Sequence, residues 1–202
     1  MFKNIAGNLA NKAKNAIDSK VNNAAQKKAD QVAQAGLKKV SLKVSGPLVD
    51  DLDQFKSEWE QKAKDPKESV FYFLMAAYQY AQGNKETGDA MASIILPTTS
   101  LEKDESSPTG FKLNANEIQS MEYFATNPDV INSFLGGDSK NNFQVNPQKL
   151  VMSVVGENKV SEDATVAVVG NIKGAITILK LRQNKKGQWK LFDFSAMLAG
   201  DF

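Results

Sequence analysis

The chain has 202 residues, of which 42% are hydrophobic, and it carries 25 Lys plus Arg against 23 Asp plus Glu. It contains neither Cys nor His, so it can form no disulfide, and the usual ligand sets of zinc, haem and iron–sulfur sites are excluded. Catalysis through a histidine base is excluded as well. We therefore expect a domain that is stabilised by its hydrophobic core and holds no metal or cofactor.

The nearly neutral total hides an asymmetry of charge along the chain. Residues 1–43 carry a formal charge of +7, whereas residues 44–202 carry −5. A basic segment joined to an acidic remainder predicts an anionic partner for the segment, or contact between the two parts. All but one of the basic residues are Lys. Because base readout favours Arg, we do not expect nucleic acid as a partner, and any such binding would be non-specific.

Residues 2–40 are rich in Ala, Lys, Asn and Gln and contain no Pro, a composition that predicts a helix. Small apolar residues recur in it with a period of about eleven, which is typical of a nearly straight helix on a surface. We predict a basic amphipathic helical arm over residues 1–43. It is a solvated helix, a partner-binding or coiled-coil helix, or a membrane-surface helix through residues 1–40. Its candidate binding residues are Phe2, Ile5, Leu9, Lys12 and Lys14.

Residues 44–202 are predicted to form one α+β domain, with helices over residues 47–134. The tetrapeptide Asp65-Pro66-Lys67-Glu68 has the residues that are favoured at the start of a helix. The helix that follows, over residues 69–82, is apolar on almost every face. A helix of that kind belongs at the centre of a core.

The C-terminal part changes to β-branched and aromatic residues in alternation, which predicts a four-stranded antiparallel sheet over residues 150–194. We expect the helices to pack on one face of this sheet. Alternation places Ile176 and Ile178 opposite Leu179 and Leu181, so both faces are apolar. The second face then needs a cover, which is another helix, a ligand cavity or a second subunit. The last alternative predicts a homo-oligomer.

Two groups in this domain are candidate binding residues. Basic side chains gather around the last hairpin, at Lys180, Arg182 and Lys190, and they are either an anion site or a solvated edge hairpin. Lys190 shares a face with the other two only if the hairpin loop has an odd number of residues. The second group, Asn141-Asn142-Phe143, follows two glycines and is either a binding loop or part of a helix termination.

Several short motifs in the C-terminal two thirds of the chain resemble a bacterial family that is known as domain of unknown function 6935. They are Asn132-Ser133-Phe134-Leu135-Gly136-Gly137, Asn141-Asn142-Phe143, Ile176-Thr177 with Leu181-Arg182, and Gly187-Gln188-Trp189 with Phe192. The resemblance covers about residues 65–200, and the turn at residues 170–174 departs from the family pattern. It implies no activity and no site residue. The order of helices and sheet also resembles the cone-shaped fold of nuclear-transport-factor-2-like proteins, an analogy that implies no function.

We therefore expect a non-enzymatic binding or assembly protein, attached by its basic N-terminal helix to a protein partner, an anionic surface or a larger complex. The alternative is a small-ligand binder or weak enzyme with a cavity against the sheet. The first residues contain no continuous apolar run of the kind that a secretory signal needs. The longest apolar run, residues 70–78, is too short to span a bilayer. These features predict a bacterial, cytoplasmic protein.

Overall fold

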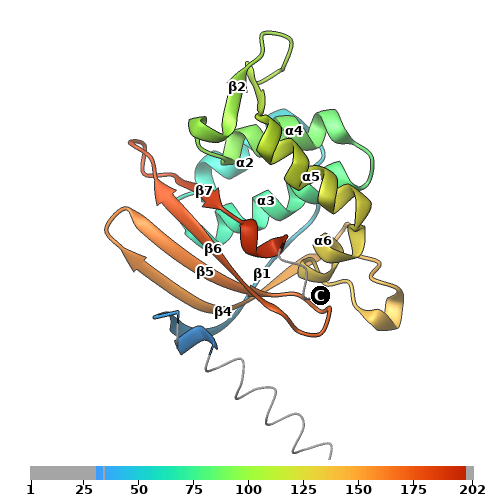
Figure 1. Cartoon of the computed structure of the whole chain (residues 1–202), viewed down its shortest axis with the longest axis vertical. Helices are drawn as coiled ribbons and strands as arrows, with labels where there is room; N and C mark the ends of the chain where they lie inside the picture. The colour runs from blue at the N-terminus through green and yellow to red at the C-terminus, as the bar shows by residue number, and fades with distance from the viewer. Residues whose placement is uncertain (1–30, 34, 199–202) are drawn as a thin grey trace, which may run out of the picture.

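The computed structural model describes residues 31–33 and 35–198, which form an α+β fold (Figure 1). The helices are α2 (Leu52–Lys62), α3 (Pro66–Ala81), α4 (Lys85–Ile95), α5 (Ala115–Thr126) and α6 (Pro128–Phe134). The main sheet contains β1 (Lys38–Gly46), β4 (Leu150–Val160), β5 (Asp163–Val169), β6 (Ile176–Gln183) and β7 (Trp189–Asp193). The short strands β2 (Leu101–Lys103) and β3 (Phe111–Leu113) form a separate ribbon.

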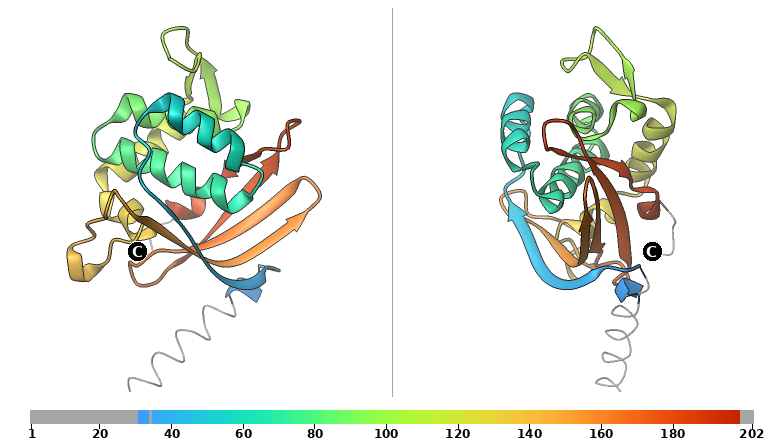
Figure 2. Two further views of the ribbon diagram at one scale, coloured as in Figure 1. Left: turned by 180° about the vertical axis from the view of Figure 1, so that it is seen from behind. Right: turned by 90° about the vertical axis from the view of Figure 1, so that its left-hand side faces the viewer.

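The main sheet is antiparallel throughout, in the order β1-β4-β5-β6-β7. The helices lie on one side of it, and the described residues that precede β1, 31–33 and 35–37, lie on the other side (Figures 1 and 2). Helices before a C-terminal antiparallel sheet were predicted, and that order is confirmed. Three short 3-10 turns complete the described chain at Thr98–Ser100, Ser139–Asn141 and Ser195–Met197.

The fifth strand, β1, corrects the prediction of a four-stranded sheet. It pairs with β4 from Lys38 opposite Glu157 to Gly46 opposite Leu150. The prediction of a helix through residue 40 is therefore wrong for residues 35–40, which form a turn, a connecting residue and the start of this strand, and the predicted arm over residues 1–43 overlaps the strand. The sequence KKVSLKVSG alternates with the period of a strand, but the Ala- and Lys-rich segment before it favoured extension of the helix. The earlier part of the predicted arm, residues 1–30, lies outside the described residues.

Helix α3 occupies the centre of the core, as its composition predicted. Its first turn is capped by Asp65, whose Oδ1 accepts a hydrogen bond from the backbone N–H of Lys67 at 2.9 Å. Its buried side chains contact the sheet and the other helices. One of them, Phe73, packs against Phe194 with the ring centroids 4.6 Å apart. Alternation would place Phe194 on the second sheet face, but β7 ends at Asp193 and the chain turns back into the core.

Helices α3 and α4 approach each other so closely that one position in α4 must be Gly. A Cβ atom on Gly88 would lie 2.6 Å from the backbone N of Tyr80 and 2.8 Å from its Cα. Real Cβ atoms do not approach backbone atoms this closely, so any larger residue would force the two helices apart.

We predict that Gly88→Ala lowers the free energy of unfolding by about 2 kcal/mol, because overpacking a tight contact costs more than alanine gains in a helix. Urea denaturation measures the effect. Gly46→Ala is the matched control, since a Cβ there would meet only a ring atom of Phe71 at 3.7 Å, an ordinary contact. Equal stability of the two variants would show that the helices can separate without cost.

Candidate functional site

The second face of the sheet, opposite the helices, is covered in part by the residues that lead into β1. Val32 and Leu37 are only 3% and 8% exposed, and they pack against Ala167 of β5. Ile176 and Ile178 of β6 pack against the same cluster. We call residues 31–33 and 35–37 the arm root. The second face was predicted to need a cover, and the arm root supplies one over β4, β5 and β6, the middle strands of the sheet.

The arm root fits a recess that the sheet provides at a glycine. The pairing of β4 with β5 shifts register between Val154 and Gly156, which produces a bulge at that point. A Cβ on Gly156 would lie 2.9 Å from Cγ1 of Val32 and 3.2 Å from Cδ1 of Leu37. The absence of a side chain at Gly156 therefore lets both residues contact the sheet closely, and this contact fixes where the chain enters the domain.

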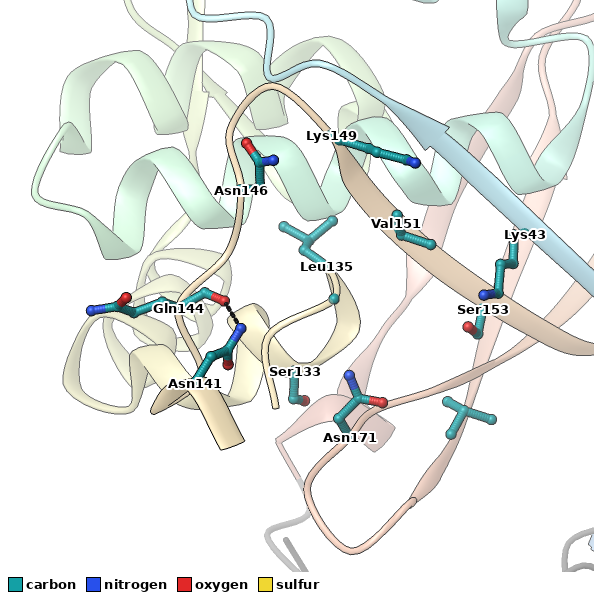
Figure 3. Close-up of a pocket in the computed structure, with 12 residues that line it drawn as sticks. Lys43, Ser133, Leu135, Asn141, Gln144, Asn146, Lys149, Val151, Ser153 and Asn171 are labelled. Atoms are coloured by element: carbon teal, nitrogen blue, oxygen red, sulfur yellow. Dashed lines mark hydrogen bonds between the residues drawn. The ribbon is translucent and has the colours of Figure 1, made fainter. Parts of the chain in front are cut away.

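A polar pocket of about 360 Å³ lies beside the arm root on the same face (Figure 3). It is lined by Lys43, Ser133, Leu135, Gly136, Asn141, Gln144, Asn146, Lys149, Val151, Ser153, Val169 and Asn171. Its floor is a row of paired residues across the sheet, from Lys43 through Ser153 to Val169. The next partner in this row is Ile176, which packs against the cluster of the arm root. The pocket and the arm root are therefore neighbours on one surface.

The wall of the pocket is the connection between α6 and β4, which contains the predicted binding loop. Asn142 and Phe143 both have positive φ values, 53° and 55°, although neither is glycine. Such backbone is costly and persists only where its surroundings impose it. The loop turns so tightly that a Cβ on Gly137 would overlap the carbonyl oxygen of Phe143. This explains the second of the two glycines, which the sequence predicted as part of either a binding loop or a helix termination.

Side-chain amides hold this loop together. Asn141 Oδ1 accepts a hydrogen bond from the N–H of Asp138 at 2.9 Å, and its Nδ2 donates to the carbonyl of Gln144 at 2.8 Å (Figure 3). From the β5–β6 turn, Asn171 Nδ2 donates to the carbonyl of Gly137 at 2.8 Å. Asn141 is thus both a lining residue and a structural clamp, whereas Asn142 is exposed and does not line the pocket.

The groups that remain for a ligand are polar and basic. Lys43 and Lys149 line the pocket, and neither forms an ion pair with a described residue. The hydroxyl of Ser153 and the side-chain amide of Gln144 also have no hydrogen-bond partner within residues 31–33 and 35–198. The lining contains no carboxylate. The site can therefore bind hydroxyl groups or an anion, but its own residues offer no acid–base pair.

The basic residues of the last hairpin do not converge. Arg182 lies opposite Lys190 in the sheet, so the loop between them has the odd length that the shared face required. Lys180, however, pairs with Asp193 at 2.9 Å, and Arg182 pairs with Asp163 at 2.8 Å. Lys190 reaches past the edge of the sheet to the helix side, where it donates to the carbonyl of Ile94. The candidate anion site of the hairpin is thus divided among three separate contacts.

Two of the tyrosines, Tyr72 and Tyr80, are engaged with carboxylates. The hydroxyl of Tyr72 donates to Glu58, and that of Tyr80 donates to Glu122, each at 2.7 Å. Burial and the adjacent carboxylates raise the pKa of both tyrosines well above the usual range. Tyr80 also lines a hollow with Asp89, but this hollow lies between α4 and the β2–β3 loop. It is not the cavity against the sheet that the alternative function requires.

Sequence reasoning identified Asn141 and its neighbours but missed the other parts of this surface. Gly156 and Val32 are distant in sequence, and only the sheet brings them into contact. Asn171 and Lys43 carried no motif, although Asn171 lies in the turn that departs from the family pattern. The candidate residues Phe2, Ile5, Leu9, Lys12 and Lys14 lie outside the described residues.

Comparison with known families explains the motifs that surround the pocket. A family model described as domain of unknown function 6935 matches residues 47–201. The chain belongs to this family. The resemblance predicted from the motifs is confirmed. The matched residues begin at 47, where the helical part starts, rather than at about 65 as predicted. No curated protein and no solved structure matches the chain.

The match to domain of unknown function 6935 begins directly after β1. The strand and the arm root therefore lie outside the matched residues, yet they complete the sheet and cover its second face. All but one of the pocket residues lie within the match, and the exception is Lys43. In the described part of the chain, no helix is both long and apolar enough to cross a membrane.

The buried position of Lys190 predicts a dependence of stability on pH. Burial lowers its pKa from 10.5 to about 8, with a further lowering by Lys186 and an opposing effect of Glu60. The folded state therefore binds fewer protons than the unfolded chain between pH 8 and 10.5. The cost of charging Lys190 is fully present below pH 8 and is relieved as the pH rises.

We expect the free energy of unfolding to rise between pH 7 and 9. The full shift of the Lys190 pKa, from 10.5 to about 8, corresponds to a change of about 3 kcal/mol, and this rise is a part of it. Lys190→Met should remove the rise and stabilise the protein at pH 7, whereas Lys185→Met, with the same change of charge on the exposed turn, should keep it. Urea denaturation at pH 7, 8 and 9 measures the three proteins. The range stops at pH 9 because the raised tyrosine pKa values lower stability at higher pH. A parallel pH profile for Lys190→Met would contradict the prediction.

Proposed function

We propose that this protein is a non-enzymatic binding or assembly protein, and that its basic N-terminal segment attaches the domain to an anionic surface, a protein partner or a larger complex. The observation that carries the proposal is the seating of the arm root in the recess at Gly156. A segment that only trailed from the domain would not need a fitted contact where it joins. The contact sets the point and the face from which residues 1–30 depart.

The distribution of charge supports the same function. Residues 1–30 contain six Lys and two Asp, so most of the +7 charge of the predicted arm precedes the arm root. Basic segments of this kind bind anionic surfaces through summed electrostatic attraction. Cytoplasmic location and self-association belong to this proposal too. Because the arm root covers the middle of the second face, a second copy would contact the remaining area around Phe192, which is 39% exposed.

We predict that removal of residues 1–30 abolishes attachment and leaves the domain folded, because Val32, Leu37 and β1 remain. Flotation with vesicles that contain anionic phospholipid, together with pull-down from a lysate, measures attachment. We expect at least a tenfold loss for the shortened chain. Full-length Lys12→Glu/Lys14→Glu should show a smaller loss in the same direction.

The matched control is full-length Lys185→Glu/Lys186→Glu, which makes the same change of charge on the domain and should bind as the unchanged protein does. Circular dichroism and urea denaturation establish that each variant is folded. If the shortened chain floats and captures partners as well as the full-length chain does, residues 1–30 are not the attachment segment.

A second candidate function is the binding of a small polar ligand in the pocket of Figure 3. The observation that favours it is that Lys43 and Lys149, which form no ion pair with a described residue, line the pocket together with hydroxyl and amide groups. Amides and hydroxyls recognise the hydroxyl groups of a ligand, and ammonium groups recognise phosphate. A sugar phosphate combines these features. This candidate does not require the N-terminal segment.

We expect glucose 6-phosphate to shift the amide resonances of Ser153 and Asn171 in NMR spectra of the full-length protein, and glucose to shift them far less. Lys43→Met should weaken the binding about tenfold, because it removes a phosphate partner worth one charge-assisted hydrogen bond. Lys39→Met, on the same strand but outside the pocket, should bind as tightly as the unchanged protein. Absence of these shifts would exclude the pocket as a sugar phosphate site.

A further inference from the structure

A second cleft lies on the helix side of the sheet, at the edge formed by β7. Its volume is about 590 Å³, and it lies between α2, the residues around the end of α4, and the β6–β7 turn. One part of its wall is apolar, with Ile94, Leu101 and Phe111. Another part carries Lys190 beside the indole of Trp59. The cleft is separate from the arm root and from the polar pocket, which lie on the opposite face.

Lys190 enters this cleft because β7 is an edge strand. Its neighbours Trp189 and Leu191 are fully buried on the helix side, so alternation directs Lys190 away from the core. Within the described residues no strand lies beyond β7, so the long side chain passes around the edge. Its Nζ donates to the carbonyl of Ile94 and lies 4.4 Å from the ring centroid of Trp59.

The ammonium group of Lys190 has no carboxylate partner among the described residues. Lys180 and Arg182, on the neighbouring strand, each form an ion pair, but no ion pair includes Lys190. A protonated lysine has three N–H donors, and the carbonyl of Ile94 accepts from one of them. A largely buried cation without a counter-ion is strongly disfavoured. An anion at this position would supply the counter-ion.

The surroundings of Lys190 add to the excess of positive charge. Lys56 and Lys186 also line the cleft, and Glu60 is the single carboxylate in its lining. Trp59 is 2% exposed, and its Nε1 has no acceptor within the described residues. The lining therefore carries three ammonium groups against one carboxylate, next to an apolar surface.

We propose that this cleft binds a small organic carboxylate with an apolar tail. The carboxylate pairs with the ammonium of Lys190, in the place of the missing counter-ion. The tail lies along Ile94, Leu101 and Phe111, where it removes apolar surface from water. An inorganic anion would satisfy Lys190 but would leave the apolar wall exposed. A neutral molecule of the same length would fill the wall but would leave the ammonium without a partner.

Binding of a carboxylate is linked to the protonation of Lys190. Burial lowers the pKa of this group to about 8, with Lys186 lowering it further and Glu60 opposing. A carboxylate at Nζ would raise the pKa again, because it stabilises the charged form. Binding at pH 8.5 should therefore take up protons from the solvent, and the affinity should fall as the pH rises above 8.

The test uses the full-length protein with hexanoate as the probe. Ligand-observed saturation-transfer NMR gives the affinity, and the amide shifts of Thr109 and Gln188 give the location, since both residues line the cleft. We expect hexanoate to bind at least tenfold more tightly than 1-hexanol and than inorganic phosphate. Lys190→Met should lower the affinity for hexanoate at least tenfold.

Lys185→Met is the matched control, because it removes the same charge from the adjacent β6–β7 turn but Lys185 does not line the cleft, and the affinity of this variant should stay within twofold. Lys190→Gln serves as a second variant if Lys190→Met does not fold. Weaker hexanoate binding at pH 9.5 than at pH 7 in the unchanged protein is also expected. The proposal is overturned if hexanoate does not bind, if 1-hexanol or phosphate binds as tightly, or if Lys190→Met and Lys185→Met bind alike.

Discussion

The burial of α3 against the sheet is the interaction on which the rest of the structure depends. This helix contacts all four of the other described helices and strands at three places in the sheet. Most of its side chains are fully buried, so it cannot be a surface element, and the neighbouring helices must arrange themselves around it. The tight approach of α4 at Gly88 follows from that arrangement. The pairs of Tyr72 and Tyr80 with glutamates follow as well, since each places a hydroxyl of α3 at the boundary of the core.

Helix α3 packs on one face of the sheet. The side chains that point the other way determine how apolar the second face is. Ile176 and Ile178 require a cover, and the arm root supplies one at the recess formed by Gly156. The cover does not extend to the row through Ser153 and Val169, where the α6–β4 connection makes a polar pocket instead. The seating of the arm root and the polar pocket, which support the two proposed functions, therefore arise from one constraint. The sheet has two apolar faces but only one layer of helices.

The sequence predicted the parts of this arrangement that local patterns determine. Asp65 and Pro66 mark the start of α3, and alternation separates the two faces of β6. Strand β1 was missed because its alternating residues directly follow a composition that favours helix, and local propensity cannot show where pairing with β4 takes over. The contact of Lys190 with Ile94 was beyond prediction for a different reason. Alternation assigns a face to the backbone position, but a long side chain at an edge strand can reach the other face.

The pairing of β1 with β4 joins segments that are far apart in the chain, with Lys38 opposite Glu157. During synthesis, β1 and the arm root emerge long before the strand that they contact. Contacts of such sequence separation form late, because closing the intervening loop costs entropy before any contact is gained. A strand with the alternating pattern of β1 is meanwhile an unpaired edge, which can associate with other chains. The lysines of β1, at positions 38, 39 and 43, give the unpaired strand a positive charge. Repulsion between nascent chains would then oppose their association until β4 leaves the ribosome.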